Sequence, residues 1–560
     1  MLVGRDREIA VVDGALAQLA EGRGAVALVS GEPGIGKTRL VSEAATRAAT
    51  RGARVAWGRC WEAGGAPAFW PWYEALGGLG LRFPDAATIA ASDPAQARFA
   101  LFRDVAAELA RAAVRSPLVL VLEDLHAADQ SSVLLLEFLA TQLRAAPIMV
   151  LGTYRDLEAS LRAEVGDVIA RSGRAGTVLA LGRLRQQDVA AVVREAVEDA
   201  DEALIARVFE TTSGNPLFVT ELVQQVRTGA SSSTIPLGVR EIIRQRLGLV
   251  SPAARLMLDA GAVLGVEFGS GDIARMATNA DPEIDAAIAS GLVTRRGDRV
   301  RFTHALYREA LYHDLPRATR HALHRDAARV LSAMGAPAAE VAHHLIEAGP
   351  EAAPDAVEQT IVAARQALDA FAFEDAVSLL ERAKLAVPAG PLEATLRARI
   401  VIALGEVRLR SGDPKGRELC VEGAQRAREL GDASLLALAG LAYGSVFLIG
   451  GVDPVMVSML EDALAGLPAV DSGLRARTMA RLAAARQPSA PALRPRDIEL
   501  ALEAVGIGRR VATRRELLEI LQSASGALYG AADPRVRITI SRDQAQLAEE
   551  LGDAPRLIAA

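Results

Sequence analysis

The stretch VALVSGEPGIGKTRL, residues 26–40, places three glycines, a proline, a lysine and a threonine between an apolar run and a helix-like run. Gly31 to Thr38 fit the pattern G-x-x-x-x-G-K-[ST], in which backbone N–H groups of a glycine-rich turn converge on phosphate oxygens. The lysine of this pattern reaches the β and γ phosphates, and the threonine hydroxyl ligates Mg²⁺. We therefore expect ATP or ADP to be bound by Gly31, Glu32, Pro33, Gly34, Ile35, Gly36, Lys37, Thr38 and Arg39.

The lysine of this stretch stands out against the composition of the chain. Of the 63 lysine and arginine residues, three are lysines, at positions 37, 384 and 415. Arginine therefore serves almost wherever a surface cation is needed, and Lys37 is a specific choice of a compact ammonium group. The other two lysines lie in segments typical of a solvated helix surface.

A pair of carboxylates follows a second apolar run, LVLVLEDLHAAD, at residues 118–129. An ATPase of this kind needs an acid at the tip of a neighbouring strand to hold Mg²⁺ and polarise water. Glu123 and Asp124 occupy that place, and Thr38 is the expected third metal ligand. The pattern does not decide which of the two acids holds the metal.

An arginine ends the next apolar run, PIMVLGTYRD, at residues 147–156. We expect Arg155 to lie near the γ-phosphate, sense whether it is present, and complete the catalytic set with Glu123 and Asp124. The alternative is a solvated arginine at the end of a strand.

These side chains must be brought together by a sheet whose strand ends meet at one edge. Residues 1–185 contain five apolar runs separated by helical segments: AVALVSG, RVAWGRC, LVLVLED, PIMVLGTYR and TVLALGRL. Runs of Val and Leu without polar alternation are typical of a parallel sheet covered on both faces. The sequence thus predicts an α/β P-loop ATPase core over residues 1–185.

The rest of the chain divides into three further predicted domains. Residues 186–235 are predicted to form a helical lid that ends in a polar break, RTGASSSTIP. Residues 236–325 combine helices with one hairpin, GLVTRRGDRVRFTH, turned at RRGD. Residues 326–560 place small residues at helical spacing, as stacked tetratricopeptide-like repeats do. The last repeat stops at LGDAPRLIAA, so we expect an incomplete array.

Composition excludes several classes of protein. With 560 residues the chain is too long for one core, and a formal charge of -6 gives no overall attraction to nucleic acid or an anionic membrane. Two distant cysteines do not make a disulfide framework or a zinc site, and the first residues lack a secretory signal. Residues 433–452 carry no charge but are flanked by Asp432 and Asp453 without basic or aromatic anchors, which favours a buried helix pair. We expect a cytoplasmic protein without membrane contact.

Seven motifs occur in the order found in one group of ATPases: LVGRDREI, GEPGIGKTRL, GRCWEAGGAPAFWPWYEAL, LVLVLEDLHAAD, GTYRD, SGNPLFVTEL and RFTHALYREALYHDLP. With these motifs the chain resembles the ATPase modules of large ATP-binding regulators of the LuxR type. That group belongs to the signal-transduction ATPases with numerous domains, which are relatives of the AAA+ proteins. The resemblance covers residues 1–330 in motifs and the remainder in general character.

The resemblance implies a winged-helix domain over residues 236–325 and further nucleotide contacts. His304, after the hairpin, would contact the diphosphate in the resting state. The resemblance also implies that the adenine is flanked by Val3, Gly4, Arg5 and the turn that ends at Pro216.

Three departures from the family pattern limit what the resemblance implies. Position 127 is alanine where a tryptophan is common, which loosens packing beneath the acidic pair. Glu123 stands where aspartate is frequent. The full regulators end in a helix-turn-helix, and residues 500–560 contain no such pattern, so no DNA-binding domain is expected in this chain.

Two other groups of residues have structural interpretations. All four tryptophans, at positions 57, 61, 70 and 72, fall in one segment, and we expect them to pack over the sheet beside the nucleotide rather than stack on bases. His343 and His344 lie in a helix without a carboxylate at ligand spacing, and we expect a structural role for both.

Together these features predict a slowly hydrolysing ATP-binding switch in transcriptional regulation. The winged-helix domain would close over ADP at rest, and the helical array would receive a protein or small-molecule inducer. ATP-dependent self-association is also expected. The alternatives are a repeat scaffold with a structural nucleotide and a fragment of a regulator that lacks its DNA-binding domain.

Overall fold

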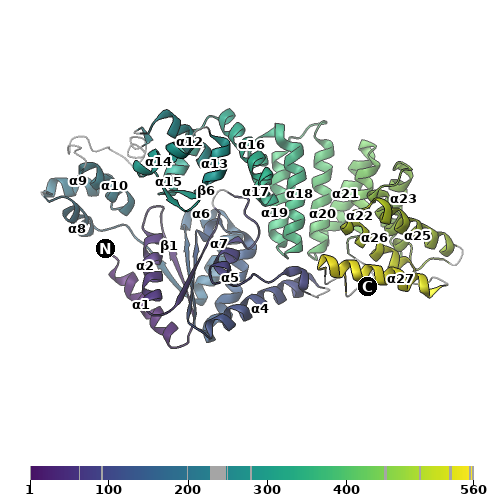
Figure 1. The fold of residues 1–560 in the computed structure, drawn as a ribbon, viewed down its shortest axis with the longest axis horizontal. Coiled ribbons are helices and arrows are strands. Elements are labelled where there is room, and N and C mark those ends of the chain that lie inside the picture. Colours follow the sequence, from purple (N-terminus) through teal and green to yellow (C-terminus); the bar gives the residue numbers. More distant parts are fainter. Residues whose placement is uncertain are drawn as a thin grey trace. The chain divides into compact units, whose positions relative to one another are not determined.

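The computed structural model describes residues 2–61, 64–89, 93–198, 200–227, 247–248, 250–277, 280–446, 451–490, 493–528, 533–553 and 556–557. The chain forms two compact units. The first comprises Met1–Phe83 with Phe102–Ala348, and the second comprises Pro84–Leu101 with Gly349–Ala560. Figure 1 colours both units by position in the sequence.

The first unit is built on a five-stranded sheet of parallel strands in the order β2-β3-β4-β1-β5. The five strands coincide with the five predicted apolar runs, so the predicted α/β core is confirmed. The strands are β1 (Ala25–Ser30), β2 (Arg54–Arg59), β3 (Leu118–Glu123), β4 (Ile148–Tyr154) and β5 (Thr177–Ala180). The helices between and around them are α1 (Asp6–Ala20), α2 (Lys37–Thr50), α3 (Trp70–Gly78), α5 (Gln130–Gln142), α6 (Asp156–Leu161) and α7 (Ala163–Ala175), together with the part of α4 (Pro94–Ala113) from Phe102 onward.

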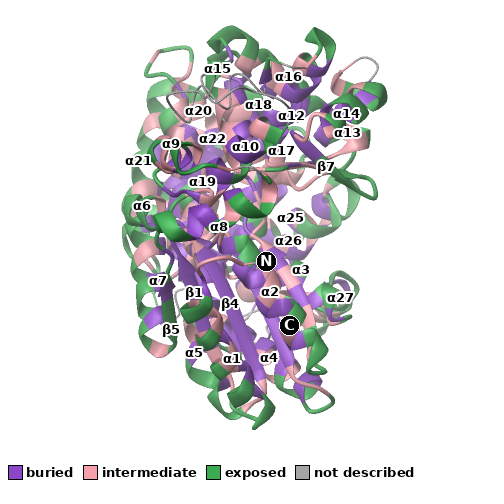
Figure 2. Cartoon of the chain, turned by 90° about the vertical axis from the view of Figure 1, so that its left-hand side faces the viewer, coloured by how far each residue is buried: buried purple, intermediate pink, exposed green. Residues whose placement is uncertain are grey.

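Helices cover both faces of this sheet (Figure 1). α1 and α2 pack against one face, where Val29, Val121 and Leu151 form a common core with them. α7 contacts β1 from the other side and packs against α5. Every residue of β3 is consequently buried, and Figure 2 shows the central strands in the colour of buried residues. A strand with two buried faces needs no polar alternation, which is why its sequence is continuously apolar.

A small bundle of three helices follows the sheet. It consists of α8 (Gln186–Ala196), α9 (Glu202–Thr212) and α10 (Pro216–Arg227), which share a core around Val193, Val208 and Val219. α10 follows a tight turn at Gly214, where φ is +75° and an added Cβ would lie 2.1 Å from the carbonyl oxygen of Leu184. Only glycine fits there, so the turn fixes where α10 begins.

A second, antiparallel sheet with the order β6-β8-β7 completes the first unit. Its strands are β6 (Glu267–Gly269), β7 (Val293–Arg296) and β8 (Arg299–Phe302), and β7 and β8 form the predicted hairpin. The surrounding helices are α12 (Pro252–Leu264), α13 (Ser270–Met276), α14 (Ala280–Ala289), α15 (Ala305–Asp314), α16 (Arg317–Ala333) and α17 (Ala338–Glu347). The winged-helix interpretation of this part stays a prediction.

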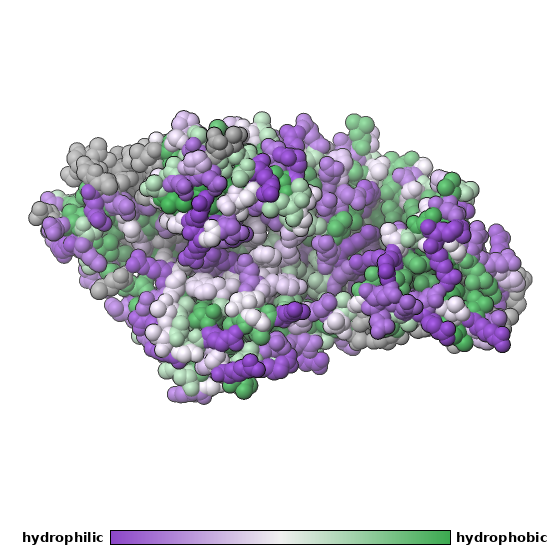
Figure 3. All heavy atoms as spheres, viewed as in Figure 1, coloured by the Kyte–Doolittle hydropathy of each residue, from purple (hydrophilic) through white to green (hydrophobic). Residues whose placement is uncertain are grey.

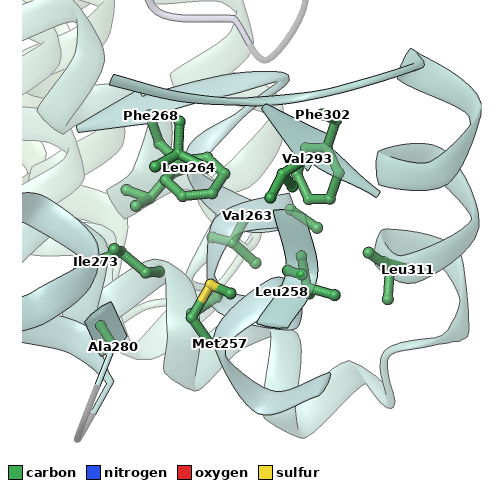
Figure 4. Packing of buried hydrophobic residues seen from close by; sticks show 14 of the residues in the cluster. Met257, Leu258, Val263, Leu264, Phe268, Ile273, Ala280, Val293, Phe302 and Leu311 are labelled. Carbon is green, nitrogen blue, oxygen red and sulfur yellow. The ribbon is translucent and has the colours of Figure 1, made fainter. Parts of the chain in front are cut away.

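The two faces of the second sheet differ in character. Phe268, Val293 and Phe302 gather with Val263 and Leu264 of α12 in an apolar core (Figure 4). Successive side chains of a strand point to opposite faces. The other face of the hairpin therefore carries Thr294, Arg299 and Arg301.

The described residues of the second unit are helical and contain no strand. Consecutive helices pack in pairs, and α18, α20, α22, α24 and α26 also contact one another in that order, which confirms a stack of helix hairpins. The helices are α18 (Ala353–Asp369), α19 (Phe373–Ala386), α20 (Ala394–Arg410), α21 (Lys415–Leu430), α22 (Ala433–Tyr443), α23 (Pro454–Gly466), α24 (Gly473–Ala485), α25 (Arg494–Val511), α26 (Arg514–Ala527) and α27 (Pro534–Leu551).

The charge-free stretch 433–452 begins with α22, whose residues are largely buried against neighbouring helices of the array. In the part of the chain that the structure describes, no helix has the length and apolar character needed to cross a membrane. Hydrophilic and apolar residues are intermixed on the face drawn in Figure 3. The predicted domain boundaries at 185 and 325 stay predictions, and the one at 235 lies outside the described residues.

Candidate functional site

The glycine-rich loop joins β1 to α2 with a backbone that only glycine adopts readily. Gly31, Gly34 and Gly36 have φ angles of +143°, +76° and +100°, all in the range that disfavours side chains. α2 starts at Lys37 and runs for 14 residues, so its first free N–H groups face the loop. A loop of this shape at a helix N-terminus binds phosphate through backbone N–H groups and the helix dipole.

The ammonium group of Lys37 lies within the loop. The residue is only 7% exposed, and its Nζ donates hydrogen bonds to the carbonyl oxygens of Gly31 at 2.7 Å and Glu32 at 3.0 Å. Burial, reinforced by the nearby positive charge of Arg155, lowers the pKa of Lys37 to about 8, against the opposing charge of Asp124. The amine is thus held beside the carbonyl oxygens of its own loop, at the centre of the predicted phosphate site.

A cavity of about 940 Å³ in the first unit adjoins the loop. It brings together distant parts of the chain: the glycine-rich loop, the ends of β2, β3 and β4, the start of α10, and the sheet β6-β8-β7 with the start of α15 that follows it. Predicted site residues among its lining are Pro33, Gly34, Gly36, Lys37, Thr38, Arg39, Asp124, Arg155, Pro216 and His304.

The two adjacent acids have different surroundings. Asp124 lines the cavity, has a left-handed backbone with φ +60°, and its N–H donates to Thr153 Oγ1 at 2.9 Å. Glu123 is fully buried, and its Oε2 accepts a hydrogen bond from Arg59 Nε at 2.6 Å. The acids of the pair therefore face different partners, one towards the cavity and one towards an arginine.

The donor set of the cavity fits a magnesium ion. Thr38 and Asp124 both line it and offer the hard oxygen atoms that Mg²⁺ prefers. Among the described residues no cluster of three or more His, Cys, Asp or Glu side chains forms a complete protein metal site. Mg²⁺ takes further ligands from phosphate oxygens and water, so the two oxygen donors of Thr38 and Asp124 are compatible with it.

Arg59, a residue that the sequence patterns do not single out, links the first sheet to the second. Besides Glu123, its guanidinium reaches Glu267 Oε2 on β6 at 3.2 Å, and Glu267 also accepts from Arg299 on β8 at 2.6 Å. Arg301 lies on the same face and also lines the cavity, and burial together with the charge of Arg59 lowers its pKa. The alternation in RVRF, residues 299–302, is the sequence signal that would have placed both β8 arginines on one face.

Arg155 is buried at the end of β4, so the alternative of a solvated arginine is wrong. Its Nη1 forms ion pairs with Glu158 at 3.3 Å and with Glu309 of α15 at 3.0 Å. His304 stands immediately before α15 and lines the same cavity. Arg155 thus connects the edge of the parallel sheet with the helix that begins beside His304.

The residues predicted to flank the adenine take two positions. Pro216 lines the cavity, and the preceding Asn215 donates from Nδ2 to the carbonyl oxygen of Pro33 at 3.0 Å. Val3, Gly4 and Arg5 are not among the residues that line this cavity. Arg5 instead donates to the carbonyl oxygens of Ile35 at 3.0 Å and Gly182 at 2.8 Å, so it braces the glycine-rich loop from behind.

The four tryptophans divide into two groups. Trp57, Trp61 and Trp70 line the cavity, whereas Trp72 is fully buried and donates from Nε1 to the carbonyl oxygen of Ser132 at 3.0 Å. The expected packing role holds for Trp72 and for Trp57, which packs against the core of the first sheet, while the rings of Trp61 and Trp70 lie edge to face with centroids 6.1 Å apart.

A group of buried histidines lies between α15, α16 and α17. His324 Nδ1 is 2.9 Å from His344 Nδ1, and Tyr312 Oη is 2.9 Å from His324 Nε2. Burial lowers the pKa of His324 to about 3 and that of His344 to about 4, so both rings are neutral near pH 7. These contacts support the structural role predicted for His344, and His343 packs against the backbone at Gly64 and Gly65.

Comparison with known proteins agrees with this geometry for the first part of the chain. Residues 1–151 match the model of the AAA ATPase domain family. A match to this family indicates nucleotide binding.

An uncharacterized protein of Rhizobium meliloti (strain 1021) is 25% identical over an alignment of 392 positions, with coverage of 58% of this chain and 36% of that protein. The chain therefore spans little more than a third of the length of this curated relative.

Two solved structures show a likeness at low sequence identity. One is a signal transduction ATPase with numerous domains and a tetratricopeptide repeat sensor from Pyrococcus horikoshii, with 14% identity, a TM-score of 0.42, and coverage of 98% of this chain and 90% of that one. The other is the ORC2 protein of Aeropyrum pernix in ADPNP and ADP complexes, with 15% identity, a TM-score of 0.31, and coverage of 60% and 95%.

Proposed function

We propose that this protein is a nucleotide-dependent switch that binds ATP or ADP with Mg²⁺ between the glycine-rich loop and the sheet β6-β8-β7. One observation carries the proposal: the cavity beside the loop is walled on its other side by Arg299, Arg301 and His304. A nucleotide in this cavity would touch both parts of the first unit at once. Its phosphates can therefore bias how firmly the two parts hold together.

The loop residues supply the phosphate cradle. Gly34 and Gly36 let backbone N–H groups approach the phosphates, and Lys37 turns from its loop carbonyl oxygens to the β and γ phosphates. Thr38 and Asp124 hold Mg²⁺. When bound, this ion neutralises phosphate charge and polarises the attacking water.

Glu123 acts as a positioning residue in this proposal. Its buried carboxylate fixes Arg59, and Arg59 in turn reaches Glu267 of the second sheet. Removal of one partner of a buried ion pair is destabilising, because the other charge is left uncompensated. Glu123 therefore supports the closed arrangement without touching the nucleotide.

Arg155 is the residue through which the γ-phosphate acts. Its guanidinium is ion-paired with Glu309 of α15. A γ-phosphate beside Arg155 competes with Glu309 for the same donors, and phosphate is the stronger partner because it carries more charge. ATP thus loosens the contact between β4 and α15, whereas ADP leaves it intact while His304 binds the diphosphate.

The helical array completes the proposed switch as its sensor. An inducer on the array would change the preference for ADP or ATP, and the ATP form would self-associate. We extend this proposal to cytoplasmic transcriptional regulation of the LuxR type, on the support of the seven sequence motifs alone.

The decisive experiment is to denature the purified protein and chromatograph what it releases. We expect ADP close to one equivalent per chain, and no nucleotide from Lys37→Ala. Subsequent exchange and turnover measurements separate the switch from a scaffold. A switch exchanges ADP and hydrolyses ATP slowly, and a structural nucleotide does neither. Absence of any adenine nucleotide from wild-type protein, with no binding on addition, would overturn the proposal.

A further inference from the structure

The helical array contains a cavity of its own, of about 1130 Å³, formed by residues of the second unit alone. Helices α18, α20, α22, α24 and α26, the alternate helices of the stack, all contribute to its lining. Small-molecule sites have volumes of roughly 300–1,000 Å³. The space in the array is therefore large enough for a complete ligand.

One part of the lining is apolar. α22 has no charged residue, and it contributes Leu438, Leu441 and Ala442 to the cavity. Ile402 and Ala403 of the adjacent α20 extend this surface. Binding of an apolar ligand body to this surface is favourable, because apolar surface of both the ligand and the protein is removed from water.

The polar part of the lining has an excess of positive charge. Seven arginines and five acids line the cavity. Every acid already forms an ion pair with an arginine of the same cavity, and these acids are Glu358, Asp369, Glu406, Glu519 and Asp553. No acidic residue of the lining is thus left over to attract a cation, and an anionic ligand is favoured.

Two of these arginines, Arg477 and Arg481, stand one helical turn apart on α24 and both reach the cavity. Arg477 pairs with Glu519 through Nη2 at 2.7 Å, while its Nε is buried without a hydrogen-bond partner in the described structure. Arg481 is 6% exposed, and burial lowers its pKa to about 10. Its guanidinium lies against Gly444, where an added Cβ would come within 2.4 Å of Nε. A carboxylate here would satisfy a buried donor and offset the burial of a cation.

We propose that the array binds a small amphipathic carboxylate, with the head group at Arg477 and Arg481 and the apolar body on α22. The proposal rests on the proposed sensor role of the array and names the chemical class of its ligand. Binding itself is a property of the second unit, so it can be measured separately from nucleotide binding.

Decanoate and 1-decanol are suitable probes, because they share an apolar chain and differ in the head group. Isothermal titration of the full chain, below the concentration at which decanoate forms micelles, is expected to show decanoate binding at least tenfold more tightly than 1-decanol. Equal affinities, or no binding of decanoate, would overturn the proposal.

Variants of α24 locate the site. Arg477→Met keeps the apolar stem and removes the charge, and we expect it to weaken decanoate binding at least tenfold. Arg475→Met is the matched control, since Arg475 lies on the same helix but does not line the cavity, and its affinity should stay within twofold of wild type. Equal effects of the two substitutions would contradict the assignment.

Gly444→Ala provides a second test that leaves every charge in place. The new methyl group displaces the Arg481 guanidinium, so decanoate binding should weaken at least fivefold, and unchanged affinity would count against the site. Affinity for a fluorescent ADP analogue, measured on the same samples, should stay within twofold in all three variants. Failure of the nucleotide proposal would appear in the ADP titration, and failure of the array proposal in the decanoate titration.

Discussion

The two cavities of this protein are both rich in arginine, but their arginines find partners at different distances along the chain. In the first unit Arg59 pairs with Glu267, 208 positions away, and Arg155 with Glu309, 154 positions away. In the array cavity Arg399 pairs with Glu358 and Arg365 with Glu406, each across 41 positions, while Arg515 reaches Asp369 across 146. Pairs such as Arg399 with Glu358 join one repeat to the next, and Arg515 with Asp369 joins α26 to the end of α18, whereas the core pairs join the two sheets and α15.

This difference separates two kinds of stability. A repeat array is held by contacts between neighbours, so the loss of one ion pair affects one interface. The long-range pairs of the first unit hold two sheets together around the nucleotide cavity. Substitutions in these long-range pairs should therefore alter the rate of nucleotide exchange more than they alter local stability.

The largest effect is expected from Lys37→Ala. Loss of the ammonium group should weaken nucleotide binding by at least 100-fold, because no other residue can place a compact cation inside the loop. Lys37→Arg should also bind poorly, since the guanidinium is wider than the ammonium group. Titration with a fluorescent ADP analogue measures both, and Lys384→Ala on the array is the control that should bind normally.

The adjacent acids should respond differently to neutralisation. Asp124→Asn is expected to slow ATP hydrolysis by about 100-fold and to reduce its dependence on Mg²⁺, because a cavity-facing metal ligand is lost. Glu123→Gln should slow hydrolysis less but speed ADP release, because Arg59 loses its buried partner. Steady-state ATP turnover at varied Mg²⁺ concentration measures the hydrolysis rate and its Mg²⁺ dependence in both variants. A larger loss of Mg²⁺ dependence in Glu123→Gln would reverse the two roles.

His304→Ala is expected to raise the rate of ADP release by about tenfold or more. A hydrogen bond to a charged group contributes about 1.5–3 kcal/mol, and this bond must break before the nucleotide leaves. A stopped-flow chase of fluorescent ADP measures the rate. An unchanged rate with a lower melting temperature would assign His304 to packing alone, and His321→Ala is the control, since His321 lies on α16 and does not line the cavity.

The smallest effect is the pH dependence of stability, which should be confined to the first unit. All seven histidines lie in that unit. His324 and His344 have lowered folded-state pKa values of about 3 and 4, so the unfolded chain binds more protons below pH 6.5 and stability falls as the pH drops from 6.5 towards 4.

Glu340 opposes this trend over part of the range. Burial raises its pKa to about 7, so its contribution is greatest below pH 4.5 and is lost as the pH rises from 4.5 to 7. Because the two histidines contribute more than the one glutamate, the net stability of the first unit still falls as the pH drops. Thermal unfolding followed by tryptophan fluorescence reports the first unit, since all four tryptophans lie there. A transition that does not move between pH 6.5 and 4.5 would contradict the assignment.

The parts of the site that could be predicted from sequence are those whose chemistry is local. Gly31 to Thr38 follow one another in the chain, and the strand ends at Asp124 and Arg155 follow from apolar runs that the sheet confirms. The bridge from Arg59 to Glu267 could not be predicted, because its partners are 208 positions apart and the motif that contains Arg59 does not point to Glu267. For the same reason the sequence did not separate the environments of Glu123 and Asp124.

In the array, the helices could be predicted from the sequence but the cavity could not. Its helices were predictable from small residues at helical spacing, and α22 was correctly expected to be buried despite its lack of charge. Its cavity was not predictable, because residues from five alternate helices meet only when the repeats stack. Degenerate repeats show where helices lie but not which side chains converge.

The low pKa of Lys37 gives the loop a chemical reactivity of its own. At pH 8 about half of this amine is unprotonated, whereas an ordinary lysine with a pKa near 10.4 is almost entirely protonated. With only three lysines in the chain, acylation at that pH tests whether the Lys37 amine, which is 7% exposed, can be reached by a reagent as readily as the more exposed Lys384 and Lys415. Bound phosphate would shield the amine, so the mass of a single peptide reads out how much of the protein carries nucleotide.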